Sequence, residues 1–253
     1  MGTLVSEAIV LHTFDYLETS RIIRLMTRDA GVQSVIARGA RNSRKRFGSA
    51  IDLFAQGTAE MEIREHRELQ VLSSFELTRG RAQFARDVGR FTAGSMIAEL
   101  ALRTSSDEPS PSLFDAVELA LDNLASASSD QTVAAGLAGA WQIIATLGFS
   151  PALDLCANCH TDLNPDAAVA FSHASGGALC PRCGQHASGN RSIPSDARNA
   201  LRSWISGGHG TALTPQEARA HQRLLREFFL EHIAGNRELK AYVVWEQGAW
   251  SAA

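Results

Sequence analysis

All four cysteines of the 253-residue chain fall in two Cys-x-x-Cys pairs, and no other stretch has residue types and spacing so specific to one kind of chemistry. Cys156 and Cys159 form the first pair, and Cys180 and Cys183 form the second. A Cys-x-x-Cys turn can direct two thiolates at one tetrahedral ion, and a second turn about twenty residues later can complete a four-sulfur shell. Because four thiolates leave no position for water or substrate, the pattern predicts one structural zinc ion and not a catalytic metal.

Three other interpretations of the cysteines stay open at this point. Two disulfides are the first, although disulfides persist in oxidising compartments and the N-terminal residues lack the charged and apolar regions of a secretory signal. A redox dithiol is the second, and it needs only one pair. A zinc deaminase is the third, because His66-Arg67-Glu68 reads His-x-Glu, but that signature has a proline before the first cysteine of its pair, whereas here Pro181 follows Cys180.

Turn and helix signals around the cysteines indicate how they are positioned. Asn164-Pro165-Asp166 and Ser175-Gly176-Gly177 predict turns on either side of a short strand at 168–171, so the second pair can return to the first. Apolar residues at helical spacing predict helices within 84–101, 113–124 and 133–147 before the cysteines, and within 195–205 and 214–233 after them. The cysteine region, residues 151–192, is therefore expected to be an insertion in a helical bundle made of residues 81–150 and 193–253.

The predicted helices carry further local signals. Ser112 with Asp115, and Thr214 with Glu217, are spaced as capping boxes, and Pro215 suits the first helical position. The 133–147 helix is rich in alanine and glycine, which lets neighbouring helices approach closely. We therefore expect it to be buried at the centre of the bundle, and the apolar run that contains it is too short to cross a membrane.

The first 80 residues have the pattern of a different domain. Apolar and polar residues alternate in five short runs, at 5–11, 23–27, 32–37, 53–63 and 69–75. Five short strands in a segment of this size predict an oligonucleotide/oligosaccharide-binding (OB) barrel, which takes single-stranded nucleic acid on one face, although an SH3-like barrel would have the same pattern. The predicted fold class is thus α+β: an N-terminal five-stranded OB-fold barrel, followed by an all-α bundle with an inserted four-cysteine zinc motif.

The charge of the chain is divided unevenly. The net charge is −3, but residues 1–90 carry fourteen Lys and Arg against eleven Asp and Glu, whereas the remainder carries ten against sixteen. Between residues 21 and 50, eight basic residues stand against Asp29 alone. A basic segment within a predicted OB barrel indicates an anionic partner, and nucleic acid is the one that the barrel suits.

Nucleic-acid contact is predicted for the second strand and for the loop after the third. Ile23 and Leu25 fall on one face of the second strand, so arginines on the other face are expected to stand clear of the core. The loop combines basic side chains with glycines and one aromatic, Phe47, which can stack on a base; the alternatives are a solvated charge run and a ring tucked into the barrel rim. The predicted DNA-binding residues are Arg24, Arg28, Arg38, Arg41, Arg44, Lys45, Arg46 and Phe47.

A series of short motifs, each weak singly, occurs along nearly the whole chain in a specific order. The motifs are Tyr16-Leu17-Glu18-Thr19-Ser20-Arg21, Thr27-Arg28-Asp29-Ala30-Gly31, Arg38-Gly39-Ala40-Arg41, Glu99-Leu100, Leu113-Phe114, Leu147-Gly148-Phe149, Gly176-Gly177-Ala178-Leu179-Cys180 and Arg226-Glu227-Phe228-Phe229-Leu230-Glu231-His232. With the predicted architecture, this order resembles the RecO family of bacterial recombination mediators. One departure is the family's closing Leu-Lys-Ser, which appears here as Leu239-Lys240-Ala241.

The resemblance implies a function. A RecO-like protein would be a cytoplasmic, nucleoid-associated, non-enzymatic bacterial protein that binds single- and double-stranded DNA largely without sequence preference and anneals complementary strands. With RecR it would help to load RecA on gaps coated by single-stranded-DNA-binding protein, whose acidic, hydrophobic C-terminal tail it would take in its helical part. Two alternatives are a zinc-dependent enzyme that processes nucleic acid, for which a paired carboxylate site and a phosphate-binding loop are lacking, and a zinc-ribbon adaptor that binds only protein.

Overall fold

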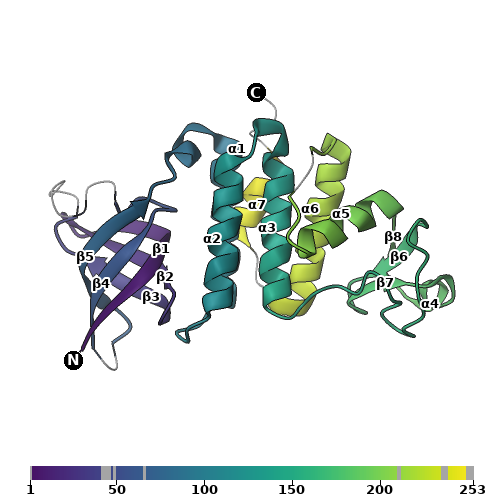
Figure 1. Cartoon of the computed structure of the whole chain (residues 1–253), viewed down its shortest axis with the longest axis horizontal. Helices are drawn as coiled ribbons and strands as arrows, with labels where there is room; N and C mark the ends of the chain where they lie inside the picture. Colours follow the sequence, from purple (N-terminus) through teal and green to yellow (C-terminus); the bar gives the residue numbers. More distant parts are fainter. Residues whose placement is uncertain are drawn as a thin grey trace.

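The computed structural model describes residues 2–40, 47, 50–64, 67–209, 212–234 and 239–248. A β-barrel, a helical bundle and a small three-stranded sheet follow one another in a row along the longest axis of the molecule (Figure 1). The bundle lies between the other two parts, so the small sheet with its cysteines is at the far end from the barrel (Figure 1).

The barrel has the strand order of an OB fold, as predicted. Its strands are β1 (Gly2–Tyr16), β2 (Ser20–Thr27), β3 (Gly31–Ala37), β4 (Gln56–Ile63) and β5 (Gln70–Arg79). They close in the order β1-β2-β3-β5-β4, with β1 also paired to β4 and with β3 and β5 parallel. This closed five-stranded arrangement leaves no free sheet edge, so a partner can bind only to the outer face of the barrel or to its loops.

Strand β1 is buried on both of its faces over part of its length. Ala8 and Val10 belong to the barrel interior, whereas Ile9 and Leu11 belong to the larger core that the barrel shares with the helices. Val32 on β3 joins the same shared core. The continuous apolar run in this strand therefore reflects a barrel that packs one outer face against the bundle.

The bundle is built around its third helix. Its members are α1 (Val88–Thr104), α2 (Pro111–Ser126), α3 (Thr132–Thr146), α5 (Ser195–Ile205), α6 (Pro215–Phe229) and α7 (Lys240–Gln247), with short helical turns at η1 (Ala82–Arg86), η2 (Ser129–Gln131) and η3 (Leu230–Ala234). Nearly every residue of α3 is buried, as predicted, and a Cβ on Gly139 would lie 2.6 Å from the Cβ of Ala120 on α2. Small residues thus set the close approach of these two helices. In the described part of the chain, no helix combines the length and apolar character that a membrane crossing requires.

Of the two capping boxes predicted at helix starts, the structure has one and lacks the other. The capping box at the start of α6 is confirmed, because the Thr214 side chain accepts from the Glu217 backbone N–H and the Glu217 carboxylate accepts from the Thr214 backbone N–H. The predicted box at Ser112 is wrong: α2 already begins at Pro111, and its fixed φ suits the first helical position.

The insertion folds as a small sheet with one short helix. Strands β6 (Val169–Ser172), β7 (Gly177–Leu179) and β8 (Arg191–Ile193) pair in the order β7-β6-β8, and α4 (Pro181–His186) follows β7. Phe171 on β6 is fully buried, with its ring centroid 6.3 Å from that of Phe228, which in turn lies 5.2 Å from Trp141 on α3. The sheet is therefore attached to the bundle through a continuous aromatic core.

Candidate nucleic-acid interface and metal centre

The four cysteine side chains meet at one point of the insertion. All four Sγ atoms lie within 4.8 Å of one another, and those of Cys159 and Cys180 are 3.7 Å apart. A tetrahedral ion about 2.3 Å from each sulfur requires sulfur–sulfur separations of about 3.8 Å, so the donor set and its spacing fit such an ion. All four residues are free cysteines in the structure.

The backbone holds the two cysteine turns in this arrangement. The carbonyl of Cys156 accepts from the N–H of His160 at 2.9 Å, and His160 has a φ of +57°, which closes the first turn. Cys180 caps α4, and its carbonyl accepts from the N–H of Gly184 at 2.8 Å. A Cβ on Gly177 would lie 2.3 Å from the carbonyl oxygen of Ala152, so glycine there lets the segment before the first turn pack against β7.

Hydrogen bonds shift the pKa values of Cys159 and Cys183 in opposite directions. Hydrogen bonds from the Thr161 hydroxyl and backbone, followed by one from Cys156, lower the pKa of Cys159 to about 6. Hydrogen bonds to Cys180 and then Cys159 raise the pKa of Cys183 to about 12. Four adjacent thiolates repel one another, and a bound cation is what allows such a cluster to be fully deprotonated.

The barrel presents an aromatic row that sequence reasoning missed. A β-bulge between Val10 and His12 shifts the register of β1 against β2, so the side chains that face outward change from odd to even positions. His12, Phe14 and Tyr16 then lie opposite Arg24, Ile22 and Ser20 of β2. Phe14 is 44% exposed and Tyr16 40%, and the ring centroids of His12 and Phe14 are 5.7 Å apart. The aromatic residue at every second position from 12 to 16 was the available signal.

Two of the predicted DNA-binding arginines lie on or beside this face. Arg24 is half-buried, and its Nε is enclosed with no hydrogen-bond partner among the described residues. Arg38 is exposed in the turn that follows β3, where Gly39 has a φ of +71°. Arg41, Arg44, Lys45 and Arg46 lie outside the described residues.

Arg28 occupies a different environment from the one expected. Its guanidinium contacts Glu7 of β1 at 2.7 Å and Asp115 of α2 at 2.8 Å, and its Cζ lies 4.5 Å from the centroid of the Phe114 ring. The hydrogen bond with Glu7 is the main cause of its raised pKa. Arg28 directly follows β2, where the chain is clear of the barrel interior but lies next to the helices, so Arg28 joins the barrel to α2 and is not free for a phosphate.

The prediction that Phe47 stacks on a base is also wrong. Its side chain is 3% exposed and belongs to the core inside the barrel, together with Ile51 and Leu72. The alternative considered for this residue, a ring tucked into the barrel, is the one that the structure has. An apolar ring surrounded by core side chains is stabilised by burial and is not offered to a base.

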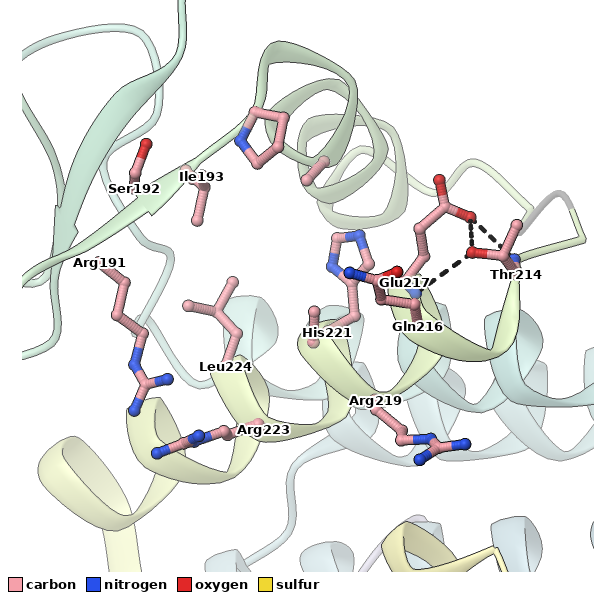
Figure 2. A pocket seen from close by; sticks show the side chains of 13 residues that line it. Arg191, Ser192, Ile193, Thr214, Gln216, Glu217, Arg219, His221, Arg223 and Leu224 are labelled. Carbon is pink, nitrogen blue, oxygen red and sulfur yellow. Dashed lines mark hydrogen bonds between the residues drawn. The ribbon is translucent and has the colours of Figure 1, made fainter.

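A pocket of 720 Å³ lies at the other end of the molecule, between β8 and α6 (Figure 2). Ile193 and Leu224 form its apolar part, and the guanidinium groups of Arg191, Arg219 and Arg223 lie along one side (Figure 2). Arg191 and Arg223 share Glu227, at 2.7 and 2.9 Å, whereas no partner of Arg219 is seen in the described part of the chain. An apolar pocket with an arginine rim is suited to an apolar, negatively charged ligand.

Comparisons with known proteins agree with the two-part architecture. Residues 1–81 match the family model for the N-terminal part of recombination protein O, and residues 85–241 match the model for its C-terminal part. The protein named DNA repair protein RecO from Anaeromyxobacter sp. (strain K) is 33% identical over 234 residues, covering 90% of this chain and 91% of the relative. The protein of that name from Myxococcus xanthus is 31% identical over 233 residues, covering 91% and 92%. The chain therefore belongs to the RecO family of DNA repair proteins.

Proposed function

We propose that this member of the RecO family binds single- and double-stranded DNA through the outer face of its barrel, largely without sequence preference, and acts as a non-enzymatic recombination mediator. One observation carries the proposal: the exposed aromatic row of His12, Phe14 and Tyr16 on β1, next to Arg24 of β2. Bases stack on exposed aromatic rings whatever their identity, and arginines beside the rings neutralise the phosphates.

The basic loop after β3 is proposed to extend this contact. Arg38 is exposed at its start, and Arg41, Arg44, Lys45 and Arg46 follow within a few residues. Such a loop can follow a phosphate backbone without reading bases, which supports binding that is sequence-blind and strongly salt-dependent. A surface that neutralises two strands at once lowers their repulsion, and this supports the annealing of complementary strands.

The four cysteines are proposed to hold one zinc ion with a structural role: Cys156, Cys159, Cys180 and Cys183. When bound, the ion would fix the two turns of the insertion, because a four-sulfur shell has no open position for a substrate. The distance of the insertion from the barrel supports this separation of roles (Figure 1). The same distance disfavours the alternative of a zinc-dependent enzyme that processes nucleic acid, because the metal site would lie far from the DNA-binding face.

Protein partners and location are inferred from family membership. We infer action with RecR to load RecA in the bacterial cytoplasm, in association with the nucleoid. We also infer that the acidic, hydrophobic C-terminal tail of single-stranded-DNA-binding protein docks in the pocket between β8 and α6, which Arg219 and Leu224 line. Charge complementarity at the arginine rim supports this assignment. Arg219→Glu should weaken binding of a tail peptide, whereas Arg86→Glu, an equal charge change on exposed η1, should not.

The DNA-binding proposal is tested by fluorescence anisotropy with a labelled oligothymidylate. Loss of one stacking ring costs about 1–3 kcal/mol, so Tyr16→Ala and Phe14→Ala should each weaken binding roughly 5- to 150-fold. Phe149→Ala is the matched control, because Phe149 is also 40% exposed but lies after α3. Wild-type protein that binds no DNA would favour the adaptor alternative, and metal-dependent turnover of the oligonucleotide would favour the enzyme. A strand-annealing assay with and without single-stranded-DNA-binding protein tests the mediator role.

A further inference from the structure

A second groove, of 950 Å³, separates the barrel from the bundle. One wall comes from β1 and β2, with His12, Phe14 and Arg24, and the other comes from α1 and the first residues of α7, with Arg103 and Lys240. His12, Phe14 and Arg24 also belong to the aromatic face of the barrel. The groove is therefore continuous with the surface that is proposed to bind DNA.

The charges in this groove are arranged for an anion. Arg24, Arg103 and Lys240 line it from three different elements, and the Arg24 Nε is an enclosed donor without a partner in the described part of the chain. Among the described residues, Glu99 is the one acidic residue in the lining. Its carboxylate already accepts hydrogen bonds from the backbone N–H groups of three successive residues at the start of α7, so its charge is compensated by the fold.

The groove also has the character of a strand-binding surface. Phe91 of α1 is 44% exposed and lines it opposite the barrel, as Phe14 does on the barrel side. Ring faces between cationic side chains are the combination that single-stranded nucleic acid uses, with its bases on the rings and its phosphates on the charges. A small anion without apolar parts, such as free phosphate, would make no stacking contact with these rings.

We infer that a single DNA strand continues from the barrel into this groove, where Arg103 and Lys240 neutralise its phosphates. The inference rests on the proposed function and adds a second part to the binding path, contributed by the helical bundle. A strand held by both parts spans more nucleotides than an OB barrel alone, which covers about 4–16. Single-strand binding by the full chain is thus expected to depend on oligonucleotide length.

Oligonucleotide length separates the two contacts experimentally. Anisotropy would be measured with oligothymidylates of about 8 and about 30 nucleotides, the first within the reach of one barrel and the second beyond it. Lys240→Gln and Arg103→Gln should each weaken binding of the long strand and reduce its log–log salt slope by about 0.7, with little change for the short strand. Arg86→Gln, which removes one exposed charge outside the groove, should change neither slope.

A neutral substitution tests the groove independently of charge. Ser95 of α1 lines the groove, and its hydroxyl donates to the carbonyl of Phe91 at 2.8 Å. Ser126 of α2 is exposed and makes the matching bond to the carbonyl of Asp122 at 3.0 Å, outside the groove. Ser95→Trp should obstruct the strand and weaken binding of the long oligonucleotide by tenfold or more, whereas Ser126→Trp should not.

The possible results separate this inference from the proposed function. Long-strand affinities and slopes that are unchanged in Lys240→Gln, Arg103→Gln and Ser95→Trp, while Tyr16→Ala still weakens binding, would overturn the groove and leave the barrel face in place. Wild-type protein that binds neither oligonucleotide would remove both. Weakening of the long strand alone supports the continuous path.

Discussion

The Oε2 atom of Glu99 on α1 accepts a hydrogen bond from the backbone N–H of Ala241 on α7 at 2.9 Å. The same carboxylate accepts from the N–H groups of Lys240 at 2.9 Å and of Tyr242 at 3.1 Å. An unpaired helix N-terminus needs acceptors, and here a side chain of another helix supplies them. Two motifs that are far apart in the sequence, Glu99-Leu100 and Leu239-Lys240-Ala241, are thereby joined.

Glu99 is predicted to anchor α7 to the bundle. Glu99→Ala would leave three backbone N–H groups without this acceptor, and we expect a loss of about 1–2 kcal/mol in the free energy of unfolding, as for removal of a strong cap. Urea unfolding followed by tryptophan fluorescence measures the loss, because Trp245 of α7 is fully buried. Glu68→Ala, at an exposed position before β5, is the control. An unchanged urea midpoint in Glu99→Ala would contradict the anchoring role.

Arg28 is predicted to act on stability and not on DNA binding. A double-mutant cycle with Arg28→Ala and Asp115→Ala should give a coupling free energy of about 0.5–1 kcal/mol, as for a partly exposed ion pair. Arg24 lies on the outer face of β2, four residues before Arg28, and provides the matched comparison. Arg24→Gln should reduce the salt slope for single-stranded DNA by about 0.7, whereas Arg28→Gln should leave it unchanged. A reduced slope in Arg28→Gln would return this residue to the DNA contacts.

Local patterns predicted the parts of the fold that depend on neighbouring residues. The OB barrel, the buried α3 and the capping box at Thr214 all follow from alternation, helical spacing or a four-residue signature. The cysteine cluster follows from spacing alone, because a Cys-x-x-Cys turn positions its own two sulfurs.

Features set by long-range packing were not predictable in this way. The alternation of β1 predicts which residues share a face, but the bulge after Val10 reverses it, and this hid the aromatic row that includes Tyr16. The strand pattern correctly predicts that Arg28 lies outside the barrel interior. Its ion pair with Asp115 depends on the docking of α2 against the barrel, which the local sequence does not show. Phe47 likewise lies in a run of charged residues, and that local pattern does not show whether its ring is exposed or buried in the barrel.

The metal centre is predicted to stabilise the insertion without contributing to DNA binding. Wild type is expected to bind one zinc ion per chain, measured by atomic emission. Cys156→Ser should bind none and should lower the thermal midpoint of unfolding, because binding of the metal is coupled to folding. At a temperature where the variant stays folded, its affinity for single-stranded DNA should match that of wild type.

Thr161→Val gives a milder version of the same experiment. The Thr161 hydroxyl lies 3.2 Å from the Cys159 Sγ, and its removal should weaken zinc binding about 10- to 100-fold without removing a ligand. The order wild type, Thr161→Val, Cys156→Ser is therefore expected for zinc retention against a competing chelator. A DNA affinity that falls in the same order as zinc content would place the metal closer to function than proposed.

His221 of α6 is predicted to make the folded protein sensitive to mild acid. It is 4% exposed, its ring centroid lies 4.8 Å from that of Trp204, and its Nδ1 is buried without a partner among the described residues. Burial lowers its pKa to about 4, an effect that the nearby Glu217 carboxylate only partly opposes. Between pH 6.5 and 4 the unfolded chain then binds a proton at this residue that the folded chain does not.

Stability supplied by the neutral ring is thus fully present above pH 6.5 and is lost as the pH falls toward 4. One pKa unit corresponds to 1.36 kcal/mol, so the full shift is worth about 3 kcal/mol. His173, whose pKa is also lowered by burial, contributes in the same direction, and the difference between variants isolates His221. His221→Phe retains a ring against Trp204 and should flatten the dependence of the unfolding free energy on pH in this range, whereas His209→Phe, at an exposed position after α5, should not. Equal pH dependence in His221→Phe and wild type would show that folding leaves the pKa of this imidazole unchanged, which would contradict the prediction.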